Sequence, residues 1–256
     1  MAKDQGADRR AQAAAIKAEA AVAAQRDKRI KLFGGIGIAV VVVGIVLAGY
    51  LGAQSAKPHA DANAKQPAGT VSGTYGFPIA PINAAKSTLT IWEDPQCPYC
   101  DAFEKSYGQT VKQWATSGKV NVVYQMATFI DDNLPQSNHA SRRALNALGC
   151  AIDEGVGEAY HKAIYDNQPA NEGDGFSDTL LKSLGVTAGL TGDKLTKFQQ
   201  CFDAGTYLGW ADNSNQYFHD KGIQGTPTLW LDGKTVPNAA LNSVATFTAY
   251  ITKYAK

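Results

Sequence analysis

The sequence lacks a strong excess of charge of either sign. Its 256 residues include 24 lysine and arginine residues and 23 aspartate and glutamate residues, for a formal net charge of +1. Domains that bind nucleic acid usually carry a marked basic excess, so the balance argues against nucleic acid as a partner. The helical part of the chain, residues 137–209, also has no fixed period, which argues against a repeat array there.

Histidine and cysteine, the usual ligands of structural zinc, are scarce, with four of each. Only Cys97 and Cys100 are close together in the sequence; the other cysteines are isolated and the histidines do not stand at ligand spacing. A zinc site would need a second pair of ligands. We also find no phosphate-binding loop and no Ser/His/Asp arrangement, and we therefore predict neither a metal nor a cofactor.

Charge is absent altogether from residues 32–53, LFGGIGIAVVVVGIVLAGYLGA. As a helix this segment would be about 33 Å long, enough to cross a hydrocarbon core of about 30 Å. Residues 1–31 carry eight basic and four acidic side chains, a net charge of +4, which predicts that the N-terminal tail stays in the cytoplasm. A cleaved signal peptide is the alternative, but its apolar core is usually roughly 7 to 15 residues. We predict a single-pass protein of the cell membrane whose remaining residues are extracytoplasmic.

The first exported residues divide into a linker and a strand–helix–strand unit. Residues 54–74 are rich in alanine, proline, glycine and serine, which is typical of a flexible linker. Residues 87–93 and 119–129 have the β-branched content of buried strands. Between them, a helical pattern begins at Pro98 and ends before Gly118. Together these segments predict a parallel β-α-β crossover.

A long helical segment interrupts this alternation. Residues 137–209 show helical spacing almost throughout. Residues 226–233 then read as a strand, followed by a short hairpin partner around the Asp232-Gly233 turn. The final residues, from Ser243, have the spacing of a closing helix. The predicted fold class is therefore α/β with a helical insertion.

Cys97 and Cys100 enclose Pro98 and Tyr99 at the end of the first predicted strand, where the helix begins. Free N–H groups and the dipole of a helix N-terminus favour a thiolate, which is the reactive form of cysteine. Pro98 suits the first helical position, and Cys100 returns to the same helix face. We predict a redox dithiol with Cys97 as the nucleophile and Cys100 as the resolving thiol; a zinc ligand pair and an inert structural pair are the alternatives.

The stretch EDPQCPYCDAFE, the helical segment and the distal GTPTLWLDG together resemble the DsbA-like branch of the thioredoxin superfamily, in particular membrane-anchored DsbA-like proteins of actinobacteria. The resemblance covers residues 75–256. It implies a thioredoxin-like fold interrupted by an α-helical insertion domain at about 137–209. It also implies a cis peptide bond between Thr226 and Pro227, opposite the dithiol, with the Thr226 backbone pairing with cysteine-containing substrate segments.

The sequence departs from this family's pattern at two places. Thioredoxins have a buried carboxylate six residues before the first cysteine, where this chain has Ile91. Glu93 and Asp94 are nearer to Cys97 and are candidates to relay protons or tune it; carboxylates at the surface or at a strand end are the alternative. The residues between the cysteines are Pro98 and Tyr99 and not the Pro-His of strongly oxidising DsbA. The same CPYC occurs in glutaredoxins and in the isomerase-like DsbG, so the motif leaves the direction of electron flow open.

Cys150 and Cys201 lie in two different predicted helices of the insertion, among apolar residues. Free buried cysteines are one interpretation. An even number of cysteines outside a membrane favours disulfides, and the resembling actinobacterial proteins have a comparable bridge. We therefore predict a structural Cys150–Cys201 disulfide.

The sequence predicts an extracytoplasmic thiol:disulfide oxidoreductase that donates its Cys97–Cys100 disulfide to newly exported or unfolded proteins with cysteines. The resemblance implies a membrane reoxidant of the DsbB or VKOR type. We expect a monomer. Isomerases of the DsbG type have a separate N-terminal dimerisation domain, and residues 54–86 are too short and polar to form one, which favours an oxidase. A reductase or isomerase kept reduced by a membrane donor is one alternative, and a non-catalytic binding module with a structural CxxC is another.

Overall fold

The computed structural model describes residues 61–256, except 62, 72, 85, 135 and 136. The described residues divide into two units, one of residues 61–236 with 251–256 and one of Pro237–Tyr250. The predicted tail (1–31) and membrane helix (32–53) lie outside the described residues. Within the part that is described, no helix has the length and apolar character needed to span a membrane.

The larger unit contains a five-stranded sheet in the order β1-β3-β2-β4-β5. Its centre is formed by β2 (Thr88–Glu93) and β3 (Asn121–Met126), which run parallel, while β4 (Thr228–Leu231) pairs antiparallel with β2. The edges are the two-residue strands β1 (Phe77–Pro78) and β5 (Lys234–Thr235). The predicted parallel crossover and the hairpin at Asp232-Gly233 are both present.

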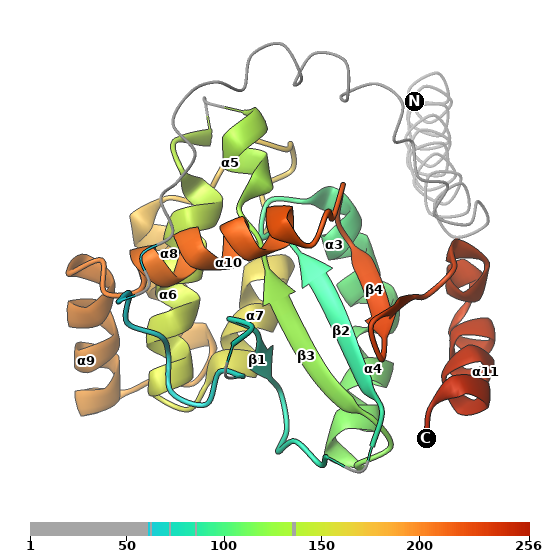
Figure 1. Cartoon of the computed structure of the whole chain (residues 1–256). Coiled ribbons are helices and arrows are strands. Elements are labelled where there is room, and N and C mark those ends of the chain that lie inside the picture. The colour runs from blue at the N-terminus through green and yellow to red at the C-terminus, as the bar shows by residue number, and fades with distance from the viewer. Residues whose placement is uncertain (1–60, 62, 72, 85, 135–136) are drawn as a thin grey trace, which may run out of the picture. The chain divides into compact units, whose positions relative to one another are not determined.

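The two central strands are buried because helices cover both faces of the sheet. Every residue of β3 is buried, as expected for a parallel strand between two helical layers. Helix α4 (Gln109–Thr116) and helix α10 (Leu208–Asp220) both contact β3, on opposite faces (Figure 1). This arrangement brings the C-terminal ends of β2 and β3 together beside the helical layer.

The predicted helix after the dithiol has three parts. Helix α3 (Pro98–Phe103) leads into a π-helical turn, η1 (Glu104–Gly108), and then into α4. The expected apolar face is buried, and it consists of Phe103, Tyr107, Val111 and Trp114. The π-helical turn was not expected from the sequence; turns of this kind are rare and are frequent at functional sites.

The helical insertion is longer than the predicted 137–209. It begins with α5 (Phe129–Asn133), part of which we expected to extend the second strand, and α10 continues to Asp220. Between them lie α6 (Ala140–Asp153), α7 (Gly157–Asp166), α8 (Asp178–Thr187) and α9 (Gly192–Asp203). Helix α6 is central to this group and contacts α5, α7, α8, α9 and α10.

The described part of the predicted linker is bound to the insertion. Asp61 and Asn213 of α10 exchange two hydrogen bonds, of 2.8 and 2.7 Å. The backbone N–H of Ala68 donates to the Asp153 carboxylate at the end of α6, at 2.8 Å. Polar side chains of the insertion thus satisfy backbone groups of Asp61 and Ala68, and the flexible linker over 54–74 stays a prediction. Residues 54–60 lie outside the described part.

The smaller unit contains the 3₁₀ helix η3 (Asn238–Asn242) and most of α11 (Val244–Tyr254), the predicted closing helix. Ser243 and Thr246 form a reciprocal cap at the start of α11. The Thr246 N–H donates to the Ser243 hydroxyl at 3.1 Å and the Ser243 N–H donates to the Thr246 hydroxyl at 3.0 Å. This cap fixes where the helix begins.

Candidate active site

The two cysteines of CPYC lie at the junction of β2 with α3, in their reduced form. Cys97 is the N-cap residue of α3 and Pro98 occupies its first turn. The backbone carbonyl of Cys97 accepts from the N–H groups of Cys100 and Asp101, at 3.0 and 3.2 Å. The helix therefore starts at the nucleophile predicted from the sequence, and Tyr99 between the cysteines is 51% exposed.

The two thiols differ in environment. A hydrogen bond from Cys100 lowers the pKa of Cys97, against the opposing effect of burial, and Thr226 and the backbone of the first helical turn lower it further. Burial raises the pKa of Cys100 well above that of an ordinary thiol, and its hydrogen bond to Cys97 adds to the rise. Cys97 is therefore the thiol that ionises more readily and Cys100 the one that keeps its proton to higher pH, which suits the roles predicted from their spacing.

Thr226 and Pro227 face this dithiol from the loop before β4. The peptide bond between them is cis, as the family resemblance implies. The Cys97 Sγ donates to the backbone carbonyl of Thr226 at 3.2 Å. A backbone hydrogen-bonding group next to the nucleophilic sulfur is suited to align an extended peptide, because such peptides are recognised through their main chain.

Side chains of the insertion hold the loop that precedes Cys97. The Gln168 amide donates to the carbonyls of Pro95 and Cys97, at 2.8 and 3.0 Å. The Tyr165 hydroxyl, from α7, donates to the Asp94 carbonyl at 3.2 Å. The position of the nucleophile therefore depends on residues about 70 positions further along the chain.

A buried polar network continues this contact on the other side of the loop. The Gln96 amide donates to the Asp131 carboxylate and to the Ser141 hydroxyl, each at 2.8 Å. Asp94, fully buried, accepts from the Ser141 hydroxyl, from the Ile130 N–H and from the Gln96 N–H. Buried polar groups that are well paired favour one arrangement of their surroundings, and here they fix the dithiol loop against α5 and α6.

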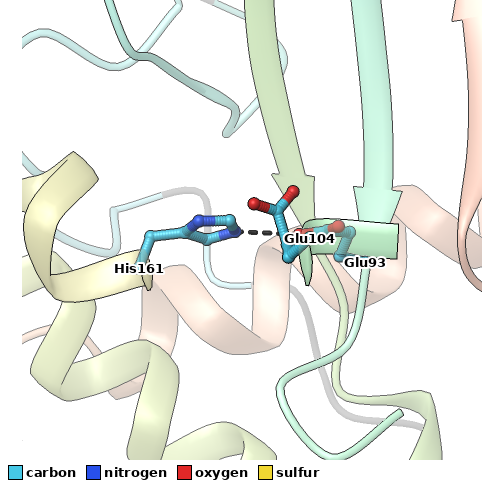
Figure 2. A group of neighbouring side chains, drawn as sticks. All are labelled: Glu93, Glu104 and His161. Atoms are coloured by element: carbon cyan, nitrogen blue, oxygen red, sulfur yellow. Dashed lines mark hydrogen bonds and ion pairs between the residues drawn. The ribbon is translucent and has the colours of Figure 1, made fainter. Parts of the chain in front are cut away.

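Glu93, predicted as a supporting carboxylate, lies at the end of β2 and is fully buried. Its Oε2 is 2.8 Å from Nε2 of His161 on α7, and Glu104 from the π-helical turn lies beside it (Figure 2). Burial raises the pKa of Glu93 well above its usual value. Burial, and then the charge of Glu93, raises the pKa of Glu104 to about 8. Whether Glu93 relays protons to the dithiol stays a prediction.

Comparison with known protein families identifies the family to which this chain belongs. A family model described as thioredoxin matches residues 82–253, more than half of the chain. The chain belongs to the thioredoxin family.

Solved structures of thioredoxin-family proteins refine this assignment. The reduced disulfide bond oxidoreductase DsbG from Mycobacterium tuberculosis is 26% identical, with a TM-score of 0.55 over 72% of this chain and 85% of that chain. Reduced DsbA from the same organism is 25% identical, with a TM-score of 0.55 over 72% and 89%. The thiol-disulfide oxidoreductase MdbA from Actinomyces oris, 19% identical, shares the fold with a TM-score of 0.62 over 77% and 99%. The thioredoxin part of this chain is a thiol:disulfide oxidoreductase domain of the DsbA or DsbG type.

A much longer curated protein also matches part of this chain. The serine/threonine-protein kinase PknE of Mycobacterium tuberculosis is 28% identical over 162 residues, which are 61% of this chain and 28% of that protein. This chain therefore spans less than a third of the length of the curated relatives it matches. The similarity concerns that shared part alone.

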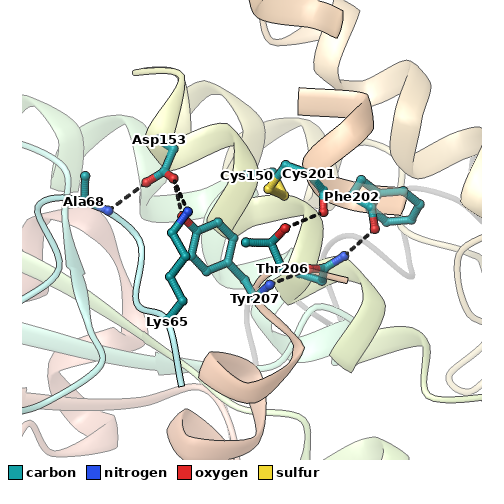
Figure 3. The surroundings of a disulfide bond; sticks show 9 residues. Lys65, Ala68, Cys150, Asp153, Cys201, Phe202, Thr206 and Tyr207 are labelled. Atoms are coloured by element: carbon teal, nitrogen blue, oxygen red, sulfur yellow. Dashed lines mark hydrogen bonds and ion pairs between the residues drawn. A yellow bond between two sulfur atoms is a disulfide. The ribbon is translucent and has the colours of Figure 1, made fainter. Parts of the chain in front are cut away.

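In this thioredoxin-family chain, Cys150 of α6 and Cys201 of α9 form the predicted disulfide, 51 positions apart in sequence. Figure 3 shows it among the helices of the insertion, near Tyr207. The backbone carbonyl of Cys201 accepts from the Thr206 hydroxyl at 3.0 Å. The bridge therefore joins two helices of the insertion and has a structural place.

Sequence reasoning missed several residues of the site. It found the dithiol, Thr226 and Pro227 because these stand in local motifs. It did not find Glu104, His161 or Gln168, which no motif marks. Glu104 in particular could not be found, because its position depends on the π-helical turn, which the sequence does not predict.

Proposed function

We propose that this protein is an extracytoplasmic oxidase that donates the Cys97–Cys100 disulfide to newly exported proteins. The observation that carries the proposal is the difference between the two thiols. A Cys97 thiolate stabilised at a helix N-terminus is a good leaving group, which favours transfer of the disulfide to a substrate.

The reaction is a pair of thiol–disulfide exchanges. A substrate thiolate attacks the Cys97 sulfur of the oxidised protein, the Cys97–Cys100 bond breaks, and Cys100 takes up the electron pair and a proton. A second substrate thiolate then attacks the sulfur of its own chain in the mixed disulfide and displaces Cys97 as a thiolate. The substrate loses two electrons and gains a disulfide, while the protein is left as the dithiol seen in the structure.

Two features support the proposed compartment. The apolar segment 32–53 follows a basic tail, and a Cys150–Cys201 disulfide suits an oxidising environment. A membrane protein of the DsbB or VKOR type would then reoxidise the dithiol. Alkaline phosphatase fused after Lys256 tests the topology: we expect an active fusion, and an inactive fusion at normal abundance would contradict an extracytoplasmic domain.

The roles of the cysteines are tested by single substitutions. Cys97→Ser should abolish oxidation of a reduced substrate such as denatured ribonuclease, because the Cys97–Cys100 disulfide that accepts the substrate's electrons can no longer form. Cys100→Ser should accumulate mixed disulfides through Cys97, visible by mass spectrometry after acid quenching. Mixed disulfides through Cys100 would reverse the assignment, and normal function after Cys97→Ser would support a non-catalytic binding module.

A reductase or isomerase is the second candidate, favoured by the similarity to the structure of DsbG. The reduction potential distinguishes the two directions and is measured by equilibration with glutathione. We expect a value near about −120 mV, the figure typical of DsbA. A value of about −220 mV or below, in the glutaredoxin range, would make the protein a reductant supplied by a membrane donor.

A further inference from the structure

Two glutamates and a histidine converge at the end of β2, outside the dithiol itself. Glu93 comes from β2, Glu104 from the π-helical turn and His161 from α7 of the insertion (Figure 2). One possible ligand atom of each, a carboxylate oxygen or an imidazole nitrogen, lies within 4.8 Å of the other two. Glu93 and His161 are 0% and 2% exposed, whereas Glu104 is half-buried, so the cluster lies mostly in the interior.

The charge of the two glutamates is the second feature of this cluster. Among the described residues, no lysine or arginine forms an ion pair with Glu93 or Glu104, and the sole ion-pair partner of Glu93 is His161. The two carboxyl groups therefore require either bound protons or a cation, because burying unpaired carboxylates is costly.

One carboxylate oxygen of Glu93 has no hydrogen-bond partner among the described residues. Oε2 of Glu93 contacts His161, but Oε1 is buried without a hydrogen-bond partner among the described residues. Glu104 is held by Tyr124, a residue outside the cluster, whose hydroxyl donates to its Oε1 at 2.9 Å. A ligating carboxylate is commonly oriented by such a hydrogen bond. The unpartnered oxygen of a fully buried side chain, within the same cluster, is a free donor site for a cation.

We infer that Glu93, Glu104 and His161 bind a divalent transition-metal ion, each glutamate through a carboxylate oxygen and the histidine through an imidazole nitrogen. Nitrogen and oxygen donors of this kind suit Zn²⁺, Co²⁺ or Mn²⁺. Atoms bound to one ion at roughly 2.0–2.2 Å lie at most about 4.4 Å apart. The cluster would close around an ion with small side-chain movements. A divalent ion would also neutralise the two carboxylates.

The π-helical turn contributes to this geometry. A Cβ atom at Gly108 would lie 2.5 Å from Oε2 of Glu104, so the glycine leaves the space in which the carboxylate sits. The site thus depends on a strand end, an irregular helical turn and a helix of the insertion. Binding of an ion at this site goes beyond the proposed exchange reaction.

The test separates this site from the dithiol, which can itself bind metal when reduced. The full-length protein carries Cys97→Ser and Cys100→Ser, so that no free thiol remains. Zn²⁺ binding is measured by equilibrium dialysis, and Co²⁺ binding by its visible d–d absorption. We expect one ion per chain and visible Co²⁺ bands. Fewer than about 0.1 ions per chain with no Co²⁺ bands would overturn the inference and leave the carboxyl groups sharing protons.

Substitutions locate the ion. In the same background, Glu104→Gln and His161→Gln should each weaken Zn²⁺ binding at least tenfold. Glu158→Gln, an acidic residue of α7 paired with Lys112, and His219→Gln, an exposed histidine, serve as matched controls and should retain it. Binding that survives Glu104→Gln, or that falls equally in the controls, would overturn the site.

Folding is checked by circular dichroism, and Glu104→Gln keeps both the side-chain size and the acceptor for Tyr124. Should the substituted chains not fold, thermal unfolding of the parent decides instead. Added Zn²⁺ should raise its Tm in a concentration-dependent way, because an ion that binds only the folded state stabilises it. An unchanged Tm would overturn the inference. None of these readouts requires oxidoreductase activity, so failure here leaves the proposed function untouched.

Discussion

At the scale of single residues, the two active-site sulfurs are distinguished by hydrogen bonding and burial. Cys97 receives a hydrogen bond from Cys100, which lowers its pKa, and burial raises the pKa of Cys100. A group with a lowered pKa is ionised at a lower pH, so alkylation of Cys97 by iodoacetamide should show a midpoint below that of an ordinary thiol. Cys100 should react only at higher pH or after unfolding. Mass spectrometry of the reduced protein across a pH series measures both.

The control for this prediction is the Cys97→Ser protein, in which fast alkylation at neutral pH should disappear. Alkylation of Cys100 before Cys97 in the parent would contradict the assignment. The comparison is informative because Cys97 is itself only 2% exposed. Fast alkylation would therefore report the thiolate and not a difference in burial alone.

At the scale of elements, the insertion takes part in the active site by holding its loop. Gln168, just after α7, donates to the carbonyls of Pro95 and Cys97. Gln168→Ala removes two hydrogen bonds, which typically contribute about 1 kcal/mol each. We expect the free energy of unfolding in urea to fall by about 1–2 kcal/mol, and exchange with a substrate to slow because the nucleophile is less well placed.

A matched substitution separates this effect from a general loss of glutamine. Gln216 of α10 forms a solvent-exposed hydrogen bond, in which its amide donates to the Asp220 carboxylate four residues away at 2.8 Å. Gln216→Ala should change stability by less than about 0.5 kcal/mol and leave exchange unchanged. Equal effects of the two substitutions would show that Gln168 has no special part in positioning Cys97.

The same scale shows what local sequence patterns can and cannot predict. The strands β2, β3 and β4 and the start of α3 were predictable, because β-branched runs, Pro98 and the spacing of apolar residues act locally. The π-helical turn was not, since its sequence has ordinary helical spacing. The first residue of helix α5 was read as strand because Phe129 lies only three positions after Met126, the last residue of β3. An apolar residue there fits either structure, and tertiary packing decides.

The site was predictable to the same extent. Cys97 and Cys100 lie in one motif, and Thr226 with Pro227 in another, so a family resemblance supplied their relation. The contact of Glu93 with His161 joins residues 68 positions apart. Neither residue stands at ligand spacing to the other, so only the packing of α7 against the strand end reveals it. Residues 61–71 likewise read as linker by composition, although polar groups of the insertion bind them.

At the scale of the whole molecule, the helical insertion holds the dithiol loop. How firmly it does so depends on the stability of the insertion itself. The Cys150–Cys201 disulfide closes a loop of 51 positions between α6 and α9. Chain-entropy arguments give about 4 kcal/mol for a loop of this size, and removal of a native disulfide typically costs about 2–5 kcal/mol. We expect the double substitution Cys150→Ser with Cys201→Ser to lower the free energy of unfolding by about that amount.

This loss should reach the active site, because α6 and α7 carry the side chains that hold the loop before Cys97. Hydrogen–deuterium exchange should therefore show faster exchange in α6 and α9 and also in residues 94–97, whose backbone groups depend on the insertion. The Cys97→Ser, Cys100→Ser protein is the control, since it loses two cysteines without losing the bridge. Faster exchange confined to α9, with residues 94–97 unchanged, would mean that the disulfide stabilises its own helices and that the dithiol loop is held independently of it.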